Sequence, residues 1–167
     1  MPKEPSTTLR ITTWRSAAWR TIVFAGTIAG AMDITAAFLH AGARGATPVR
    51  VLQAVASGVL GPESFTSGAG AAALGLGLHF LIAHIWAAIY YAASRRFAFL
   101  TARPMLAGAL YGLLVNTLMR EVVVPLSAAP RFAGQTPLHV AIGYGIHVVC
   151  VGLPIALIVA RLRRSAG

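Results

Sequence analysis

Residues 71–93 read AAALGLGLHFLIAHIWAAIYYAA and contain no Asp, Glu, Lys or Arg. An α-helix rises about 1.5 Å per residue, and the hydrocarbon core of a bilayer is about 30 Å thick, so this run is long enough to cross it. Only helices and closed barrels satisfy their backbone hydrogen bonds in lipid, and the run does not alternate polar with apolar residues as a barrel strand does. We therefore predict a transmembrane helix over residues 71–93.

Three further stretches, residues 21–40, 104–126 and 139–160, are similarly long and apolar. Together the four stretches predict an all-α, polytopic membrane protein, with four transmembrane helices forming one bundle and residues 1–167 forming one membrane domain. Residues 21–40 are longer than the apolar core of a cleavable signal peptide, about 7–15 residues, and Asp33 stands within them. We expect this first helix to be retained as a membrane span.

The composition fits the same fold class, because 57% of the residues are hydrophobic and only 11% are charged. A soluble domain has about 25% charged residues on average. The net charge of +10 comes from short clusters of Lys and Arg beside the apolar runs, so it does not indicate a nucleic-acid-binding surface. We expect the lipid bilayer, and not a nucleic acid, to be the partner of this chain.

The placement of the basic residues predicts the orientation, since Lys and Arg are enriched in cytoplasmic loops. With the N-terminus inside, ten basic residues are cytoplasmic: Lys3, Arg10, Arg15, Arg20, Arg95, Arg96, Arg103, Arg161, Arg163 and Arg164. Only Arg44, Arg50, Arg120 and Arg131 then lie outside or near the outer ends of spans. We therefore expect both termini in the cytoplasm, with residues 1–20 as a cytoplasmic segment and with Tyr90 and Tyr91 at the inner interface, where aromatic rings are favoured.

The outer loop over residues 41–70 is long enough to contain structure of its own. Thr47 and Pro48 are a suitable N-cap and first residue for a helix, and four apolar residues of the segment 49–60 then share one stripe: Val51, Leu52, Val55 and Val59. This pattern predicts a short interfacial helix on the outer leaflet or capping the bundle. A loop helix that packs on the protein without touching the membrane is the alternative.

A repeated pattern suggests an internal duplication. The motif Gly-x-Gly-x-His occurs at Gly75 to His79 and again at Gly143 to His147, 68 positions later, and Arg95-Arg96 recurs as Arg163-Arg164 at the same offset. The pattern Gly26-xxx-Gly30 in the first span is also matched by Gly108-xxx-Gly112 in the third. We therefore expect two tandem helical hairpins, related as a parallel repeat about an axis along the membrane normal.

The glycines of these motifs are expected to serve helix packing, because small residues spaced four apart let helix backbones approach closely in lipid. The predicted packing positions are Gly26, Gly30, Gly75, Gly77, Gly108, Gly112, Gly143 and Gly145. A cofactor or a lipid headgroup lying against the smooth glycine face is the alternative interpretation.

Polar residues within the predicted spans define an intramembrane layer. By the rise of about 1.5 Å per residue, Asp33 lies about 18 Å above the inner end of its span. His79 and His147 lie about 12 Å below the outer ends of theirs by the same estimate. The layer comprises Asp33, His79, Asn116, Arg120, Tyr144 and His147. Ionisable residues at this depth are costly and usually face the protein interior, so any function should be sought here.

Four interpretations of this layer follow. In the first it is structural, with Asp33 paired with Arg120 and the histidines donating to carbonyls or to Asn116. In the second it belongs to a proton or small-solute pathway, for which Asp and His at membrane depth are typical. In the third His79 and His147 ligate a haem or a metal ion, with Asp33 as an added ligand. In the fourth the chain is a scaffold that binds a lipid or a membrane partner.

No catalytic motif of soluble enzymes occurs: the chain has no Gly-x-Ser-x-Gly, His-Glu-x-x-His, phosphate-binding loop or dinucleotide fingerprint. We therefore do not expect an enzyme, and we predict no cofactor apart from the haem or metal alternative at His79 and His147. A homo-oligomer and a complex with another membrane protein are both compatible with the sequence.

From the second span onward the chain resembles an uncharacterised family of bacterial inner-membrane proteins typified by YagU. The resemblance lies in residues 79–91, Leu106 to Leu110, Pro125-Leu126 and the His147 helix that ends in Arg163-Arg164. It implies a multi-pass protein of the bacterial inner membrane with a link to acid tolerance. The family has no established activity or functional residues, so the resemblance assigns no role to any residue of this chain.

Overall fold

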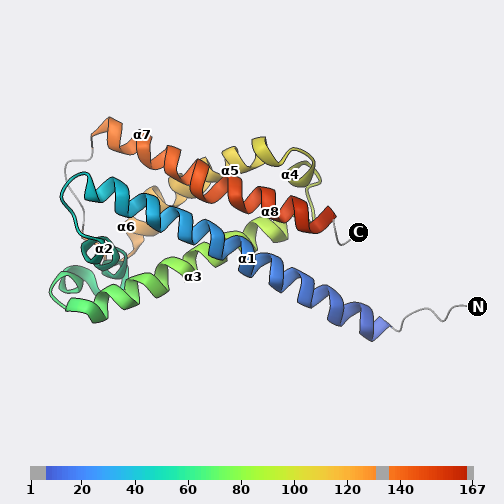
Figure 1. Ribbon diagram of the computed structural model, residues 1–167, viewed down its shortest axis with the longest axis horizontal. Coiled ribbons are helices and arrows are strands. Elements are labelled where there is room, and N and C mark those ends of the chain that lie inside the picture. The colour runs from blue at the N-terminus through green and yellow to red at the C-terminus, as the bar shows by residue number, and fades with distance from the viewer. Residues whose placement is uncertain (1–6, 131–135, 165–167) are drawn as a thin grey trace, which may run out of the picture.

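The computed structural model describes the backbone of residues 7–130 and 136–164, and side chains from residue 18 onward. Lys3 and Arg131, which entered the predicted charge distribution, lie outside the described residues. The described chain is helical almost throughout (Figure 1). Its elements are α1 (Thr7–Gly42), α2 (Pro48–Leu60), the 3₁₀ turn η1 (Gly61–Phe65), α3 (Gly68–Ser94), α4 (Phe99–Ala102), α5 (Pro104–Leu118), the π segment η2 (Met119–Val123), α6 (Val124–Leu126), α7 (Pro137–Ile146), the π segment η3 (His147–Gly152) and α8 (Leu153–Arg164).

Four helical stretches among these residues are long and apolar enough to cross a membrane: Ala18–Gly42, Gly68–Ser94, Pro104–Leu126 and Pro137–Arg164. Each contains one of the four predicted spans, so the prediction of an all-α chain with four candidate membrane-spanning helices is confirmed. The first span belongs to a longer helix, because α1 begins at Thr7. The third and fourth spans are composite, since each contains a π segment.

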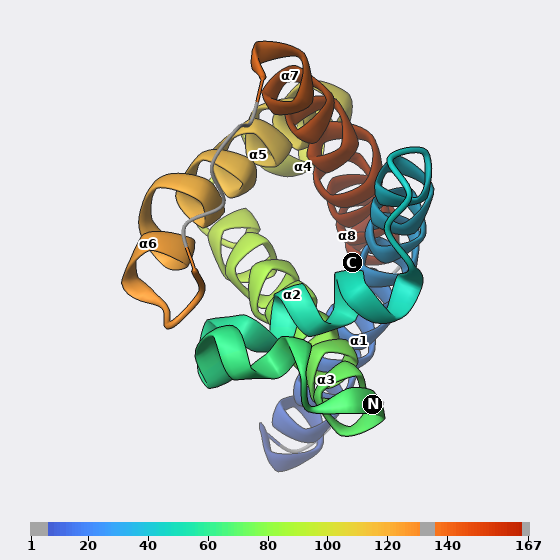
Figure 2. The ribbon, with the colours of Figure 1, turned by 90° about the vertical axis from the view of Figure 1, so that its left-hand side faces the viewer.

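Helices that follow one another along the chain pack together. The second span, α3, lies against α1, and the fourth span, η3 with α8, lies against α5. Contacts of α1 with η3 and α8 then join the two pairs into one bundle, as the view along its length shows (Figure 2). We call the end that carries α2 the α2 end and the opposite end, which carries α4, the α4 end; α1 starts and α8 finishes at the α4 end (Figure 1).

Glycine allows close approach within each pair. A Cβ atom on Gly26 would lie 2.9 Å from the Cα of His84 in α3, and one on Gly30 would lie 2.9 Å from the ring of Phe80. In the second pair, a Cβ on Gly112 would lie 2.5 Å from the Cα of Val148 in η3. Real Cβ atoms are essentially never found at such distances from other heavy atoms, and at Gly26 and Gly112 the neighbour is backbone, so these two glycines set the separation of the helices.

The predicted glycine set is therefore correct in part. Gly108 faces Gly152, a packing glycine that the sequence pattern did not reveal, and a Cβ on Gly75 would overlap the backbone of α2 at Leu52. Gly77 and Gly145 have no neighbouring atom within 4 Å of such a Cβ, so the prediction that they pack is wrong. Both stand two positions after a glycine that faces a neighbour, a shift of about 200° around the helix at 3.6 residues per turn.

The α4 end is held by polar side chains bonded to backbone. Arg163 donates to the carbonyl oxygen of Ser94, and Arg164 donates to Thr101 O at 3.0 Å. The hydroxyl of Tyr90 donates to Leu100 O at 2.9 Å. Tyr90 is 1% exposed, so it belongs to the protein core and does not face lipid as an interfacial ring would.

Helix α2 begins as predicted, with the Thr47 side chain accepting from Arg50 N at 3.2 Å. Its buried face differs from the predicted apolar stripe, because Gln53, Ala56 and Ser57 are buried, whereas Val59 is 61% exposed. The small residues face α3, against which α2 packs, since only they permit the approach that Gly75 allows. The helix ends at Gly61, whose φ of 65° is accessible to glycine at little cost.

Candidate functional site

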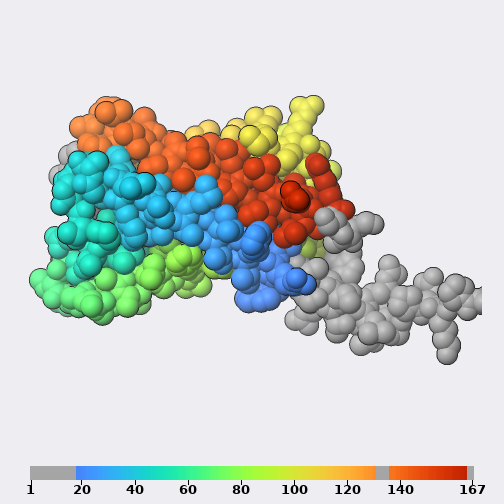
Figure 3. Space-filling model, in the orientation of Figure 1, coloured from blue at the N-terminus to red at the C-terminus, as the bar shows by residue number. Residues whose placement is uncertain are grey.

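The α2 end contains a cavity of about 680 Å³ between α1, α2 and the fourth span. Its walls come from three helices and the turns beside them: Asp33, Ala37, His40, Ala41, Arg44, Ala46, Arg50, Val51, Ala54, Phe65, His139, Gly143, Ile146 and His147. A volume of this size is typical of sites for small molecules, which span roughly 300–1,000 Å³. Figure 3 shows α1 and the fourth span side by side on one face of the molecule, and both extend to the α2 end.

The α1 wall is one helical stripe. Asp33, Ala37 and Ala41 follow each other at intervals of four residues, which places them on one face of the helix, and Arg44 follows in the turn after α1 ends at Gly42. A carboxylate stands at the deep end of this stripe and a guanidinium at its outer end. The two alanines between them leave the space that larger side chains would fill.

The wall from the fourth span repeats this geometry in the opposite chain direction. His139, Gly143 and His147 are spaced four residues apart along α7 and into η3, and they face the same cavity. His139 is close to the start of α7 and His147 two turns deeper. Because α1 and α7 run in opposite directions, His40 and His139 lie at the mouth, whereas Asp33 and His147 lie at depth.

Histidine and arginine side chains lie at the mouth of the cavity. The rings of His40 and His139 approach to 5.7 Å between centroids at an interplanar angle of 66°. His139 is oriented by Thr136, whose Oγ1 lies 2.8 Å from Nδ1 of the ring. The guanidinium of Arg50 lies 4.0 Å above the Phe65 ring and donates to Phe65 O at 3.4 Å, so its position is fixed, while Arg44 is exposed beside it.

The deep end is defined by Asp33 and His147, which are both half-buried. The Nδ1–H of His147 donates to Gly143 O at 3.0 Å, which leaves Nε2 of the neutral ring as an acceptor. The Asp33 carboxylate makes no hydrogen bond or ion pair with any residue that the structure describes. It therefore faces the cavity as a group that can accept protons or hydrogen bonds from whatever enters.

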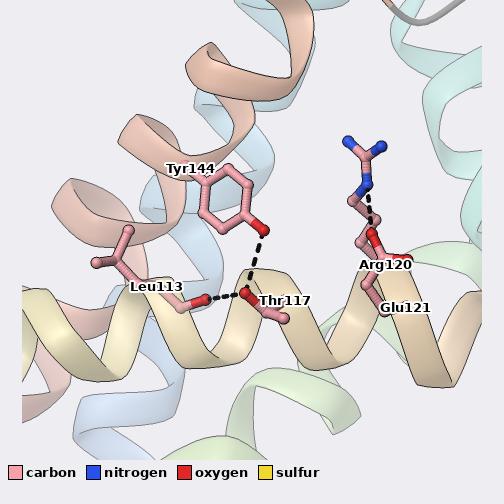
Figure 4. Close-up of polar contacts among 5 residues, drawn as sticks. All are labelled: Leu113, Thr117, Arg120, Glu121 and Tyr144. Carbon is pink, nitrogen blue, oxygen red and sulfur yellow. Dashed lines mark hydrogen bonds and ion pairs between the residues drawn. The ribbon is translucent and has the colours of Figure 1, made fainter. Parts of the chain in front are cut away.

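The predicted pairing of Asp33 with Arg120 is wrong. Arg120 Nε donates to Glu121 Oε1 at 2.8 Å, and the two side chains are 40% and 61% exposed (Figure 4). Arg120 does not line the cavity that contains Asp33. The physical reason is local: the π segment η2 holds both charges of the Arg–Glu pair on the surface, where they neutralise each other.

Two other members of the predicted layer join the third and fourth spans to each other. Thr117 donates to Leu113 O at 2.9 Å, so the Tyr144 hydroxyl donates to Thr117 Oγ1 at 3.1 Å (Figure 4). Asn116 is 8% exposed and lies beside Gly143, where a Cβ would be 3.7 Å from its Oδ1. These residues link the helices without lining the cavity.

His79 and its neighbour His84 join α3 to α1. The Nε2–H of His79 donates to Gly30 O at 2.9 Å, and Nδ1–H of His84 donates to Phe80 O at 2.6 Å. Thr27 Oγ1 lies 3.3 Å from the other nitrogen of His84. The expectation that histidines at this depth donate to carbonyls is therefore confirmed for His79, and likewise for His147.

The predicted layer thus splits into three places, of which only the Asp33 and His147 pair lines the cavity. The mouth residues His40, His139, Arg44 and Arg50 were not identified as site residues from the sequence. A usable signal was present, namely the four-residue spacing from Asp33 to Ala41 and from His139 to His147. It could not be used without knowing that these two stripes face each other.

The haem or metal alternative at His79 and His147 needs a different arrangement from the one observed. His79 Nε2 is occupied by its bond to Gly30, and no three His, Cys, Asp or Glu side chains within the described ranges gather around one point. A ligand role for His79 would use its other ring nitrogen, Nδ1, and His79 does not line the cavity that contains His147.

No protein-family description, curated protein or solved structure matches this chain. The chemistry of the cavity therefore has to be deduced from its own residues.

Proposed function

We propose that this chain is a multi-pass protein of the bacterial inner membrane whose cavity is the outer half of a proton or small-solute pathway. The observation that carries the proposal is the Asp33 carboxylate, half-buried in the cavity and without a hydrogen-bond or ion-pair partner among the described residues. It stands nine residues before the end of the first span at Gly42, about 14 Å deep at a rise of 1.5 Å per residue. Carboxylates at such depth mark ion or substrate routes.

The structural interpretation required an ion pair between Asp33 and Arg120, which is absent. An unpaired charge would destabilise the bundle without fixing the register of any helix. A group that is exposed to a cavity can instead be satisfied by water, a proton or a solute. This difference favours a pathway over a structural layer.

Orientation follows from the basic residues. Arg20 and the six arginines Arg95, Arg96, Arg103, Arg161, Arg163 and Arg164 lie at or beside the α4 end. The bias of basic residues toward the cytoplasm then puts the α4 end and both termini inside, and the cavity opens outward. A bacterial inner membrane is the location that the resemblance to YagU implies.

A buried aromatic core below the cavity supports a pathway that is open from one side. Below the cavity, the Tyr90 and Tyr111 rings pack at 4.8 Å between centroids, and the Tyr111 hydroxyl donates to Trp86 O at 2.7 Å. Tyr90 belongs to the buried core of the bundle, and a second hollow of about 700 Å³, lined by residues 19–27 of α1 and by Leu162, lies toward the α4 end. An outward-open and inward-closed state is one of the two end states that a carrier requires.

Equivalent contacts in the two helix pairs support the tandem duplication. Adding 82 positions in the first span and 68 in the second converts two glycine contacts of the first pair into contacts of the second. The Gly26–His84 contact of the first pair corresponds to the Gly108–Gly152 contact of the second. The Gly30–Phe80 contact corresponds in the same way to Gly112–Val148. Thr35 and Thr117, also 82 positions apart, each donate to the carbonyl four residues earlier, at 2.7 and 2.9 Å.

Cysteine accessibility tests the outward cavity. We expect Ala37→Cys, in a Cys150→Ser background, to react with a membrane-impermeant thiol reagent added from the outer side of intact cells. Ala31→Cys is the matched control, because Ala31 is exposed on α1 within the span but does not line the cavity. Equal and slow reaction at both positions would show that water does not reach this cavity.

Flux through reconstituted vesicles tests the pathway itself. Asp33→Asn should reduce proton or solute-driven pH change by at least tenfold, measured with an enclosed pH-sensitive dye, while the yield of folded protein stays unchanged. Arg120→Gln is the control, because Arg120 lies away from the cavity. Wild-type vesicles no more permeable than empty ones to protons and to every small solute offered would contradict the proposal.

A further inference from the structure

We propose that the solute of this cavity is an elongated dipolar molecule, with an amine that binds at Asp33 and a carboxylate or phosphate that binds at Arg44 and Arg50. An aliphatic segment would join these two ends. This inference rests on the proposed function, since it names the class of solute that the same cavity admits.

Charge is separated along the cavity. Among the described residues that line it, Asp33, at depth, is the only acidic one, and Arg44 and Arg50, at the mouth, are the only arginines. A simple cation would meet two positive charges at the entrance, and a simple anion would meet a carboxylate at the base. A molecule that carries both charges, at opposite ends, satisfies both sites.

Hydrogen-bond acceptors lie at the deep end of the cavity, and hydrogen-bond donors lie at its mouth. At depth, an ionised Asp33 only accepts hydrogen bonds, and His147 has its Nδ1–H occupied and offers Nε2 as an acceptor. An ammonium group, with three N–H donors, matches two acceptors. At the mouth, the guanidinium groups donate only, and the forked geometry of arginine suits carboxylates and phosphates.

The distance between the charged groups sets the length of the solute. Asp33 stands nine residues before the end of α1 at Gly42, and Arg44 lies in the turn just beyond that end, so about 14 Å of helix separates Asp33 from this turn. Their side chains can lean toward each other, so the charged ends of the solute should be on the order of 10 Å apart.

The middle of the cavity is lined by apolar side chains. Ala37, Ala41, Val51, Ala54 and Ile146 line it between the two charged ends. None of them offers a side-chain hydrogen bond, so a polar backbone such as a sugar would lose its bonds to water there. Each buried methylene should instead raise affinity roughly fourfold, which favours an aliphatic connection.

Calorimetric titration of the full chain in detergent tests the inference. The probes are straight-chain ω-amino acids of four to eight carbons, each compared with the carboxylic acid and the amine of equal length. We expect the best amino acid to bind at least tenfold more tightly than either single-ended compound, with affinity rising with length. Equal affinity for 8-aminooctanoate and octanoate would overturn the proposal.

Two variants test which end of the solute binds at which residue. Asp33→Asn should weaken 8-aminooctanoate at least tenfold and leave octanoate unchanged, whereas Arg44→Gln should weaken both acids and leave octylamine unchanged. Retained binding of the single-ended probe shows in each case that the variant is folded. If Asp33→Asn weakens the amino acid and the simple acid equally, the amine does not bind at Asp33 and the assignment is wrong.

The accessibility assay separates this inference from the proposed function. Saturating 8-aminooctanoate should slow labelling of Ala37→Cys severalfold and leave Ala31→Cys unaffected. If Ala37→Cys is labelled from outside but no ω-amino acid binds or protects it, the outward cavity stands and the dipolar solute is refuted. If Ala37→Cys is not labelled, both proposals fail.

Discussion

At the scale of single residues, two kinds of glycine differ in what surrounds them, although the sequence presents them alike. Gly112 lies against the backbone of Val148, whereas Gly145 has no atom within 4 Å of the position of a Cβ. The first glycine therefore fixes a helix-to-helix distance, and the second only lowers helix propensity.

This difference predicts opposite effects of the same substitution. Gly112→Ala should destabilise the protein by about 1–3 kcal/mol, because the helices must separate to admit a methyl group. Gly145→Ala should be neutral or stabilising by up to about 1 kcal/mol, since alanine is the better helix former. Thermal unfolding in detergent measures both, and a loss of stability at Gly145 equal to that at Gly112 would contradict the packing assignment.

The separate positions of Asp33 and Arg120 predict how substitutions at the two residues combine in their effect on stability. Because Arg120 pairs with Glu121 and does not line the cavity of Asp33, Asp33→Asn and Arg120→Gln should act independently. In a double-mutant cycle on unfolding, the coupling energy should stay within about 0.5 kcal/mol. A coupling energy well above this value would show that Asp33 and Arg120 interact, as the sequence suggested.

At the scale of secondary-structure elements, each π segment stands just before a proline. η2 ends two residues before Pro125, and η3 ends two residues before Pro154. Proline lacks the N–H that would bond to the carbonyl four residues earlier, and π segments are a known source of helix irregularity. Only η3 contains a residue of the cavity, His147.

The two prolines should therefore differ in their effect on the site. Pro154→Ala permits a regular α-helix, which would turn His147 by about 100° and lower ω-amino acid affinity at least fivefold. Pro125→Ala is the matched control and should leave affinity unchanged, because η2 does not line the cavity. Titration of the two variants decides the matter, and equal affinities would show that the π register of η3 is irrelevant to binding.

At the scale of the whole molecule, the two ends of the bundle differ: the α2 end contains the cavity with Asp33, and the α4 end is held by tyrosine and arginine side chains that bond to backbone carbonyls. Figure 2 looks onto the α2 end, where α2 crosses the bundle and α1 and α7 finish or begin. In the proposed orientation, with the arginine-rich α4 end in the cytoplasm, the α2 end is the outer one.

Topology reporters test this arrangement. A fluorescent protein fused after Gly167 should fold and fluoresce in the cytoplasm, and alkaline phosphatase inserted after Ser67 should be active outside. Ser67 lies in the turn before α3, at the α2 end. Active phosphatase at the C-terminus would invert the molecule and turn the cavity toward the cytoplasm.

How far the sequence anticipated this site can be judged from Asp33 and His147. Both were expected in one polar layer from their depth alone, and they do share the cavity. Arg120 was assigned to the same layer by the same estimate, yet it bonds to its neighbour Glu121. Depth along a helix follows from counting residues, but the direction in which each helix is turned does not.

The sequence by itself determined the number and extent of the spans, the start of α2 at Thr47, and most of the packing glycines, because apolar length and local spacing act within one segment. Only the tertiary structure decided which polar side chains meet. It placed the stripe from Asp33 to Ala41 opposite the stripe from His139 to His147, and it directed His79 to Gly30. The physical reason is that in lipid every helix is apolar on most faces, so the rotation of each helix is set by close packing at glycines such as Gly26 and Gly112 and not by hydrophobic pattern.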